Sequence, residues 1–153
     1  MNVYHYTMMA KVFLPKLIKQ RPKHQSAFIA VSSCSCLRYM PSFLEYSATK
    51  AFATHLTLAA KQEIASHKLI ELQTVVPAAT NTNVVEDPRM AWVGTPTPKA
   101  VGAFLDQLAT GYTYTFGTGW NEFLARFWWG WCGRHCGPLF DYMMTLGGRL
   151  VEH

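Results

Sequence analysis

The sequence has few charged residues, no long apolar run and no recognisable leader segment. Charged side chains make up 15% of the 153 residues, against about 25% in an ordinary soluble domain. No stretch reaches the roughly 18 uncharged apolar residues that a membrane-spanning helix needs. The first residues lack the basic start and apolar centre of a secretory signal peptide. These absences argue against a membrane span and a secretory leader, and the length suits one domain with a sizeable core.

The sequence also gives little indication of a zinc or nucleic-acid site. Its four cysteines form the pairs Cys34-x-Cys36 and Cys132-x3-Cys136. The first pair is tighter than zinc-binding spacing, so we expect reduced, mostly buried thiols and no metal site. The net charge is +5, and basic residues gather over residues 16–24 without a nucleic-acid-binding motif. We expect a solvated helix end there, with cofactor phosphates or anionic lipid as the alternatives.

The apolar pattern predicts alternating helices and strands. The expected elements are a helix over the first twenty residues that Pro15 kinks or loosens, a strand over Ala27–Val31, a loop over Cys34–Phe43, a helix over Leu44–His67, a strand over Leu69–Val76, an irregular segment over Ala78–Pro98, a helix over Lys99–Ala109 and a short strand within Gly111–Trp120. Ala27–Val31 is an uninterrupted apolar run, which is typical of a strand in a parallel sheet covered on both faces, and we expect Leu69–Val76 to be a second buried strand that Pro77 ends. A strand, a long helix and another strand indicate a doubly wound α/β sheet.

Apolar residues at helical spacing suggest which side of each long helix packs inward. The expected stripe on the first helix contains Val3, Tyr6, Ala10, Phe13, Leu14 and Leu17, and the one on the second contains Ala48, Phe52, Leu56, Ala59 and Glu63.

Tyr46 and Lys50 are the strongest candidates for chemistry. They lie four residues apart near the start of the second helix, so their side chains share one face. A free tyrosine, with a pKa of about 10, carries protons poorly at neutral pH. A neighbouring ammonium favours the phenolate, which makes a tyrosine more useful as a general acid or base. The spacing alone is common in helices, where tyrosine packs and lysine reaches into solvent.

Two hydroxyl residues strengthen this interpretation. Ser33 follows the first strand, thirteen residues before Tyr46, and Thr82 follows Pro77 at the end of the second strand. Open α/β sheets bind ligands at the carboxyl ends of their strands. A hydroxyl at that edge is suited to hydrogen-bond a substrate carbonyl while Tyr46 exchanges a proton with it. We assign this role to Ser33 on spacing, and expect the adjacent Ser32 to cap the strand.

These pieces together resemble the short-chain dehydrogenase/reductase family. The matching segments are Val31-Ser32-Ser33, the run Tyr46-Ser47-Ala48-Thr49-Lys50, Pro77 with Thr82, and a helix that opens at Asn2 and carries Leu14-Pro15. They cover roughly residues 2–83. The Tyr-Ser-Ala-Thr-Lys form of the motif and the segment after Thr97 look like the branch of hydroxysteroid dehydrogenases and very-long-chain 3-oxoacyl-CoA reductases.

The resemblance implies a role for each matching residue. Tyr46 would be the acid/base, and Lys50 would lower its pKa and bind the nicotinamide ribose. Ser33 would polarise the carbonyl, and Asn2 would hold a water in a proton relay. Pro77 and Thr82 would touch the nicotinamide end of the cofactor, NADP(H) by branch resemblance or NAD(H). Hydride would come from that cofactor, because no side chain supplies it.

The chain departs from the family pattern in two places. Ala78 stands where the family usually has glycine. The glycine-rich turn that receives the pyrophosphate is not found, since all ten glycines lie at or after Gly94. The expected fold is therefore the C-terminal half of a Rossmann-like doubly wound parallel sheet, without the cofactor-binding N-terminal half. For lack of the glycine-rich turn, we expect this chain alone to be inactive. We expect one partial domain over residues 1–153, with a catalytic core over 1–83 and a substrate loop and aromatic region over 84–153.

The segment Phe116–Tyr142 is rich in Trp, Phe and Tyr. One interpretation is a substrate-domain helix that packs its aromatic side chains in the core. Another is an interfacial segment at the level of lipid headgroups. By resemblance, the second suits an enzyme bound to the endoplasmic reticulum membrane; a cytoplasmic location is the alternative.

Two functional hypotheses follow. The first is an oxidoreductase that interconverts a hydrophobic ketone and alcohol, either a steroid or a long-chain 3-oxoacyl thioester. The second is a catalytically inactive fragment that acts by binding another protein or a membrane surface. In the family, the helix expected over Leu44–His67 commonly packs against its counterpart, so the resemblance also implies a homodimer.

Overall fold

The computed structural model describes residues 2–20, 25–41, 43–81, 94–108, 110–111, 114–123, 125–127, 138 and 142. Its elements in chain order are α1 (Asn2–Lys19), β1 (Ser26–Val31), the 3-10 helix η1 (Cys34–Cys36), α2 (Leu44–Glu63), β2 (Ile70–Val75), β3 (Thr80–Asn81), β4 (Thr95–Pro96), α3 (Thr97–Asp106), β5 (Tyr114–Thr115) and α4 (Gly119–Phe123). These confirm the expected alternation of helices and strands, but the segment Ala78–Pro98, expected to be irregular, contains β3, β4 and the first residues of α3. Helix α2 ends four residues before the expected His67.

The main sheet has the strand order β1-β2-β5, and both pairings are parallel. Strands β1 and β2 start and end together, with Ser26 opposite Ile70 and Val31 opposite Val75. Helix α2 connects them, as a parallel pair requires a crossover. Strands β3 and β4 form a second, smaller parallel sheet. The fold is therefore α/β with parallel sheets, as expected.

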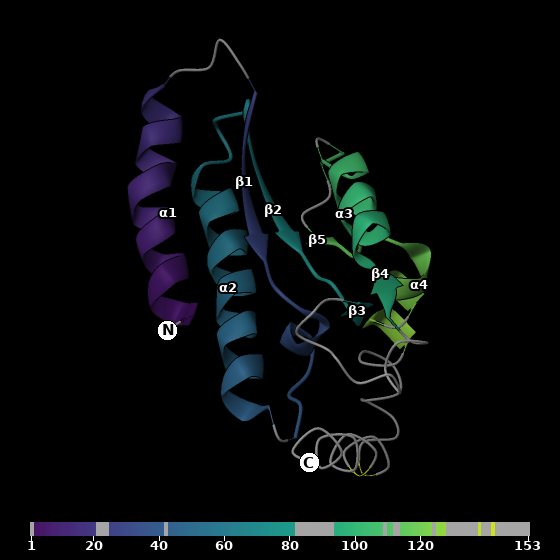
Figure 1. Cartoon of the computed structure of the whole chain (residues 1–153). Coiled ribbons are helices and arrows are strands. Elements are labelled where there is room, and N and C mark those ends of the chain that lie inside the picture. The colour runs from purple at the N-terminus through teal and green to yellow at the C-terminus, as the bar shows by residue number, and fades with distance from the viewer. Residues whose placement is uncertain are drawn as a thin grey trace.

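Helices α1 and α2 lie side by side along the sheet (Figure 1). A core cluster joins Ala60 of α2 and the following C-cap residue Ile64 to Leu72 of β2, and Leu14 and Phe28 pack against it. The end of α3 contacts the opposite side of β2, because the Gln73 amide donates to the Gln107 carbonyl at 3.0 Å and neighbouring strand residues point to opposite faces. The fully buried Leu72 and Gln73 thus anchor the two layers.

The expectation that β1 is covered on both faces is wrong. Its residues alternate between covered and exposed positions. Ile29 and Val31 are 41% and 53% exposed, whereas β2 is buried at five of its six positions. Within the described residues, no helix covers the outer face of β1 and no strand pairs with its free edge.

The inward faces of both long helices differ from the expected stripes. On α2, the buried residues are Ser47, Ala53, Thr54, Thr57 and Ala60, while Ala59 and Glu63 are exposed. On α1, Ala10 is buried and Tyr6, Leu14 and Leu17 are half-buried, as expected, but Val3 and Phe13 are exposed. Helix α1 continues through Pro15 to Lys19. Small and hydroxyl side chains let α2 approach the sheet closely. A search for apolar residues at helical spacing does not identify such side chains as buried.

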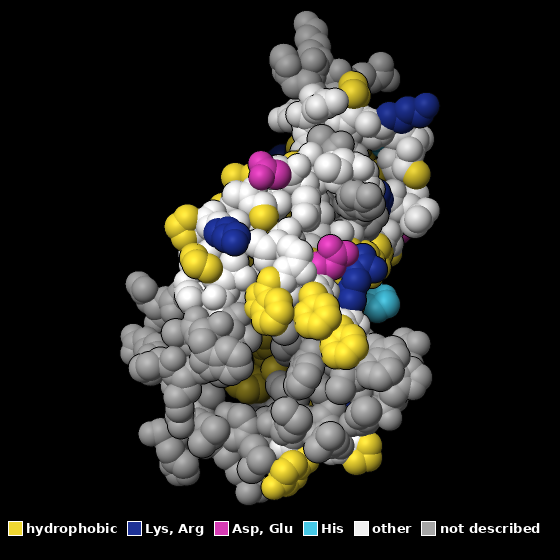
Figure 2. Space-filling model, turned by 90° about the vertical axis from the view of Figure 1, so that its right-hand side faces the viewer, with side chains coloured by type: hydrophobic (Ala, Val, Ile, Leu, Met, Phe, Trp, Pro, Cys, Tyr) yellow, Lys and Arg dark blue, Asp and Glu magenta, His cyan; other side chains and the backbone are white. Residues whose placement is uncertain are grey.

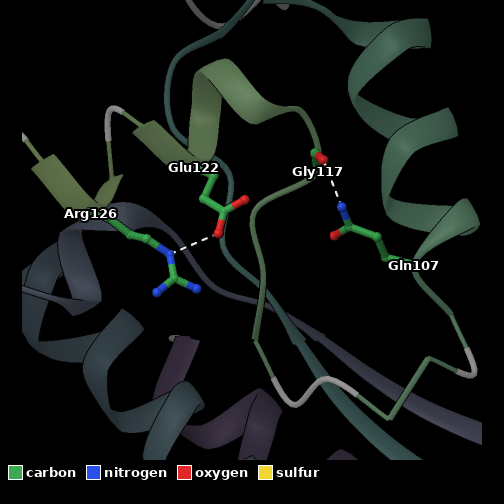
Figure 3. A network of polar contacts seen from close by, with 4 residues as sticks. All are labelled: Gln107, Gly117, Glu122 and Arg126. Carbon is green, nitrogen blue, oxygen red and sulfur yellow. Dashed lines mark hydrogen bonds and ion pairs between the residues drawn. The ribbon is translucent and has the colours of Figure 1, made fainter.

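A polar network ties α3 to the segment after β5 (Figure 3). The Gln107 side-chain amide donates to the Gly117 carbonyl at 2.8 Å. Gly117 has a positive φ of 76°, a backbone conformation that glycine adopts without steric cost. Beyond it, Arg126 pairs with Glu122 at 2.8 Å. The Gln107 bond holds the segment after β5 against the end of α3, whereas the Arg126–Glu122 pair is an exposed contact between residues four apart.

Exposed aromatic side chains stack along α4. The ring centroids of Trp120 and Phe123 are 5.7 Å apart, and those of Phe123 and Phe127 are 5.1 Å apart. All three are 41–50% exposed, and Figure 2 shows apolar side chains gathered on one face of the molecule. Among the described residues, no helix has the length and apolar character to cross a membrane.

Candidate active site

The carboxyl ends of β1 and β2 meet at one edge of the sheet. The Ser32 amide donates to the Val75 carbonyl at 2.8 Å, and the Cys34 amide donates to the Pro77 carbonyl at 2.9 Å. The parallel pairing therefore continues beyond both strands. It brings the segment that contains Ser33 alongside Pro77, at the edge where open α/β sheets bind ligands.

Tyr46 and Lys50 project from the first two turns of α2. Tyr46 is 42% exposed, and Lys50 is half-buried. The Lys50 ammonium lies 5.5 Å from the centroid of the Tyr46 ring, within the range of a cation–π interaction. The expected juxtaposition of phenol and ammonium is thus present in the structure.

The Lys50 ammonium is held at the end of β1. Its Nζ donates to the Val31 carbonyl at 3.0 Å, and the Tyr6 hydroxyl donates to the same oxygen. Burial lowers the pKa of Lys50 from its ordinary value. In the part of the chain that the structure describes, no carboxylate lies within ion-pair distance of Lys50. Its positive charge is therefore balanced by a carbonyl dipole and aromatic faces.

The two adjacent serines have different surroundings. Ser32 is 2% exposed; its hydroxyl donates to the Lys50 carbonyl at 2.9 Å and accepts from the Thr54 hydroxyl at 2.8 Å. Ser33 is half-buried and caps η1 by accepting from the Ser35 amide at 3.3 Å. Ser32 thus joins β1 to α2, whereas the Ser33 hydroxyl is partly accessible. No hydrogen bond joins Ser33 to Tyr46, and the catalytic role of Ser33 stays a prediction.

Asn2 is linked to the Tyr46 segment through Thr49. The Asn2 side-chain amide donates to the Thr49 hydroxyl at 3.4 Å, and that hydroxyl donates to the Tyr46 carbonyl at 2.8 Å. The start of α1 therefore lies against the first turns of α2. Thr82, expected at the nicotinamide end of the cofactor, lies outside the described residues.

Tyr6 also lies next to the Tyr46–Lys50 pair. The sequence pattern placed this residue only on the packed face of α1. It lies four residues after Asn2, on the same side of the helix. Lys50 Nζ is 5.8 Å from its ring centroid. Burial raises the pKa of Tyr6, and the nearby Tyr46 raises it further. The four-residue spacing from Asn2 was the sequence signal that could have identified Tyr6 as a site residue.

Fold and site together define an α/β protein with a tyrosine–lysine pair at the carboxyl edge of a parallel sheet. The family model described as short chain dehydrogenase matches residues 1–91. The chain belongs to the short-chain dehydrogenase family. This confirms the expected family and its α/β fold, and it makes the chain a member of an oxidoreductase family.

The curated relatives that match are named as inactive. The human "Inactive hydroxysteroid dehydrogenase-like protein 1" is 29% identical over 102 residues, which cover 64% of this chain and 29% of that protein. The mouse protein of the same name is 32% identical over 76 residues, or 50% of this chain and 22% of that protein. The chain spans less than a third of the length of these relatives.

Solved short-chain dehydrogenases have the same fold. The enzyme from Burkholderia cenocepacia J2315, solved in complex with NADP, is 26% identical with a TM-score of 0.67, covering 82% of this chain and 51% of that one. The enzyme from Streptomyces avermitilis is 20% identical with a TM-score of 0.68, covering 96% and 59%. The chain thus spans about half the length of the solved proteins.

Proposed function

We propose that this chain carries the catalytic part of an oxidoreductase that interconverts a hydrophobic ketone and alcohol, with Tyr46 as the acid/base. The observation that carries the proposal is the partly exposed Tyr46 phenol next to the Lys50 ammonium, with a ring-to-nitrogen distance of 5.5 Å. A phenol in that place is suited to give a proton to a carbonyl oxygen, or to take one from an alcohol.

The proposed roles of the other residues follow from hydrogen-bonding capacity. The Ser33 hydroxyl would donate to the substrate oxygen and hold it beside Tyr46. Asn2 would order a water near the start of α2, where its amide already bonds Thr49. Pro77 and Thr82 would border the nicotinamide. These assignments rest on the family motif.

A nicotinamide cofactor is supported by the donor set that remains at Lys50. An ammonium has three donors, and the Val31 carbonyl takes one of them. The others are suited to ribose hydroxyls. When bound, the cofactor supplies or accepts the hydride. We favour NADP(H) over NAD(H), because a similar solved enzyme is a complex with NADP.

The proposed substrates are a steroid or a long-chain 3-oxoacyl thioester. The support is branch resemblance: the curated relatives are hydroxysteroid dehydrogenase-like by name. The exposed stack of Trp120, Phe123 and Phe127 is compatible with a lipid-like substrate or a membrane surface. We accordingly propose lipid contact at the endoplasmic reticulum, and a homodimer formed through α2.

An inactive protein is the second candidate function. The observation that favours it is the name of the curated relatives, which are called inactive. In that case the chain would act by binding a protein or a membrane, and the Tyr46–Lys50 pair would be without catalytic use.

A cofactor titration separates the two candidates. The purified chain is titrated with NADPH while nicotinamide fluorescence is followed, and turnover is then assayed with steroid ketones and 3-oxoacyl-CoA thioesters. Saturable binding that Lys50→Met weakens, with turnover that Tyr46→Phe abolishes at little change in NADPH affinity, is the result expected of the enzyme. Turnover that survives Tyr46→Phe would exclude Tyr46 as the acid/base. A folded chain that does not bind NADPH would favour the second candidate.

A further inference from the structure

The Lys50 ammonium lies between two tyrosine rings from different helices. Its Nζ is 5.5 Å from the centroid of Tyr46 on α2 and 5.8 Å from the centroid of Tyr6 on α1. Both distances are within the roughly 6 Å over which a cation is attracted to an aromatic face. With no carboxylate in ion-pair distance among the described residues, the rings are its main electrostatic partners besides one carbonyl.

The carbonyl that Lys50 contacts is that of Val31, and it accepts hydrogen bonds from two side chains. Val31 is the last residue of β1, and the Ser32 amide that follows it already faces β2. Because consecutive strand residues point their main-chain groups to opposite sides, the Val31 carbonyl faces the free edge of the sheet. It accepts hydrogen bonds from Lys50 and from the Tyr6 hydroxyl. Tyr6 thus contacts the lysine through its ring and the lysine's acceptor through its hydroxyl.

We infer that Tyr6 is a positioning residue for Lys50: its ring and that of Tyr46 enclose the ammonium, and its hydroxyl fixes the Val31 carbonyl that receives it. The inference rests on the proposed function, in which Lys50 acts on Tyr46 and on the cofactor ribose. Three elements meet at this point, since Tyr6 belongs to α1, Val31 to β1 and Lys50 to α2. Without Tyr6, the four-carbon side chain of Lys50 can occupy more rotamers, and fewer attractive contacts hold its ammonium beside Tyr46.

The two phenols differ in exposure, which assigns them different tasks. Tyr6 is half-buried with its proton committed to Val31, and burial raises its pKa, with Tyr46 as the second cause. Tyr6 therefore stays a neutral donor where general acid–base chemistry operates. Tyr46 is the phenol with access to solvent. Environments that divide the roles of two similar titratable groups are typical of catalytic sites.

The alternative is that Tyr6 only fills space between α1 and the sheet. Three variants of the full chain distinguish the two roles. Tyr6→Phe keeps the ring and removes the hydroxyl, whereas Tyr6→Leu keeps an apolar side chain and removes the ring. Tyr4→Leu is the matched control, because Tyr4 is on the same helix and is 67% exposed.

The measurement is the NMR signal of Lys50 in protein labelled with ¹³C at lysine Cε, assigned with Lys50→Arg. Protons close to the face of an aromatic ring are shielded by its ring current. With two tyrosine rings near its ammonium, Lys50 should have Cε proton chemical shifts upfield of those of Lys11, an exposed lysine on α1. Tyr6→Phe should retain that displacement and Tyr6→Leu should reduce it by roughly half, because one of two rings is removed. Tyr4→Leu should leave it unchanged.

An unchanged Lys50 signal in folded Tyr6→Leu, or a wild-type signal that coincides with that of Lys11, would overturn the inference. If Tyr6→Leu does not fold, nuclear Overhauser contacts from the Lys50 Cε protons to both tyrosine rings decide the matter in the wild-type chain. Contacts to both rings support the enclosure, and contacts to Tyr46 alone overturn it.

The same proteins show whether the positioning has a functional effect. Where the wild-type chain binds NADPH, Tyr6→Leu should raise the Kd about threefold to tenfold, as expected for the loss of one cation–π contact, and Tyr6→Phe should retain most of the affinity. If NADPH binds neither wild type nor variant while the Lys50 signal behaves as predicted, the proposed function fails and the enclosure stands. NADPH binding that Tyr6→Leu leaves unchanged would overturn the positioning role alone.

Discussion

The Ser32 hydroxyl donates a 2.9 Å hydrogen bond to the main-chain carbonyl of Lys50, while the Thr54 hydroxyl donates to Ser32 at 2.8 Å. This buried chain of hydroxyls ties the end of β1 to the second turn of the helix that carries the tyrosine–lysine pair. Ser32 therefore holds two elements together, whereas the hydroxyl of Ser33 accepts from the Ser35 amide and caps η1.

Ser32→Ala should lower the free energy of unfolding by about 1–3 kcal/mol, because it leaves a buried donor without its partner. Ser33→Ala should cost about 0.5 kcal/mol, since Ser33 caps only a three-residue helix. Urea unfolding followed by circular dichroism measures both values. If Ser33→Ala destabilises the chain as much as Ser32→Ala, the assignment of the two hydroxyls is wrong.

A double-mutant cycle provides the control. Thr54→Val removes the other hydroxyl, and the Ser32→Ala/Thr54→Val protein should be less destabilised than the sum of the single variants. Replacing both partners of a buried hydrogen bond removes the orphaned group that makes each single change costly. Strict additivity would show that the two hydroxyls act independently.

Stability above pH 10 should depend on Tyr6. Its folded-state pKa is raised above the ordinary 10.0 by burial and by Tyr46, so the folded chain keeps a proton that the unfolded chain releases. The free energy of unfolding should therefore fall as the pH rises from about 10 through the folded-state pKa. Tyr6→Phe should remove the part of this decline that Tyr6 causes, which is measured as the difference between variant and wild-type unfolding curves at pH 8–12. The raised pKa values of Cys34 and Tyr114 cause a further decline that both proteins share.

The shifted pKa of Lys50 should change the free energy of unfolding with pH in the opposite direction to that of Tyr6. Burial lowers its folded-state pKa below the ordinary 10.5, so the unfolded chain holds more protons in the interval just below 10.5. Stability contributed at this site should rise with pH through that interval. Lys50→Met should flatten the rise, and an unaltered pH profile would contradict the half-buried position of the ammonium.

Cys34 should react more slowly with iodoacetamide than Cys36. Burial raises the pKa of the Cys34 thiol to about 12, and the side chain packs in a core cluster with Val76 and Phe116. The thiolate is the nucleophile, and burial limits its formation and its access to reagent. Peptide mass spectrometry of the folded chain after brief alkylation at pH 8 gives the relative rates. Faster labelling of Cys34 would show that the η1 segment opens readily.

The sequence allowed the prediction of the elements that carry the site, because their signals are local. The Tyr46–Lys50 spacing, the apolar run of β1 and the hydroxyl that follows it can each be recognised from a few neighbouring residues. The outer face of β1 was predicted wrongly, since its cover depends on what packs there and not on the strand's own residues. Tyr6 was missed as a site residue because its relation to Lys50 spans α1, β1 and α2. The hydroxyl-rich inner face of α2 escaped detection because apolar periodicity does not record buried serine and threonine.

Of the two described glycines with a positive φ, Gly117 should be the harder to replace. Its φ is 76°, and an added Cβ would lie 2.8 Å from Cε1 of Phe104. An L-residue in this left-handed region costs about 1–2 kcal/mol, and displacement of the Phe104 ring adds to it. The same residue accepts the hydrogen bond from Gln107 (Figure 3). Gly117→Ala should lower the free energy of unfolding by at least this amount, measured by urea denaturation.

Two other glycines separate the causes of that loss. Gly111 has a φ of 80° with nothing within 4 Å of an added Cβ, so Gly111→Ala should show the backbone cost alone. Gly102 lies inside α3 with open space around it, and Gly102→Ala should stabilise the chain by about 0.5–1 kcal/mol through helix propensity. The order Gly117, Gly111, Gly102 from most to least destabilising is the expected result. Equal losses at Gly117 and Gly111 would mean that Phe104 moves aside freely, and that the loop between α3 and α4 is held by its backbone and not by side-chain packing.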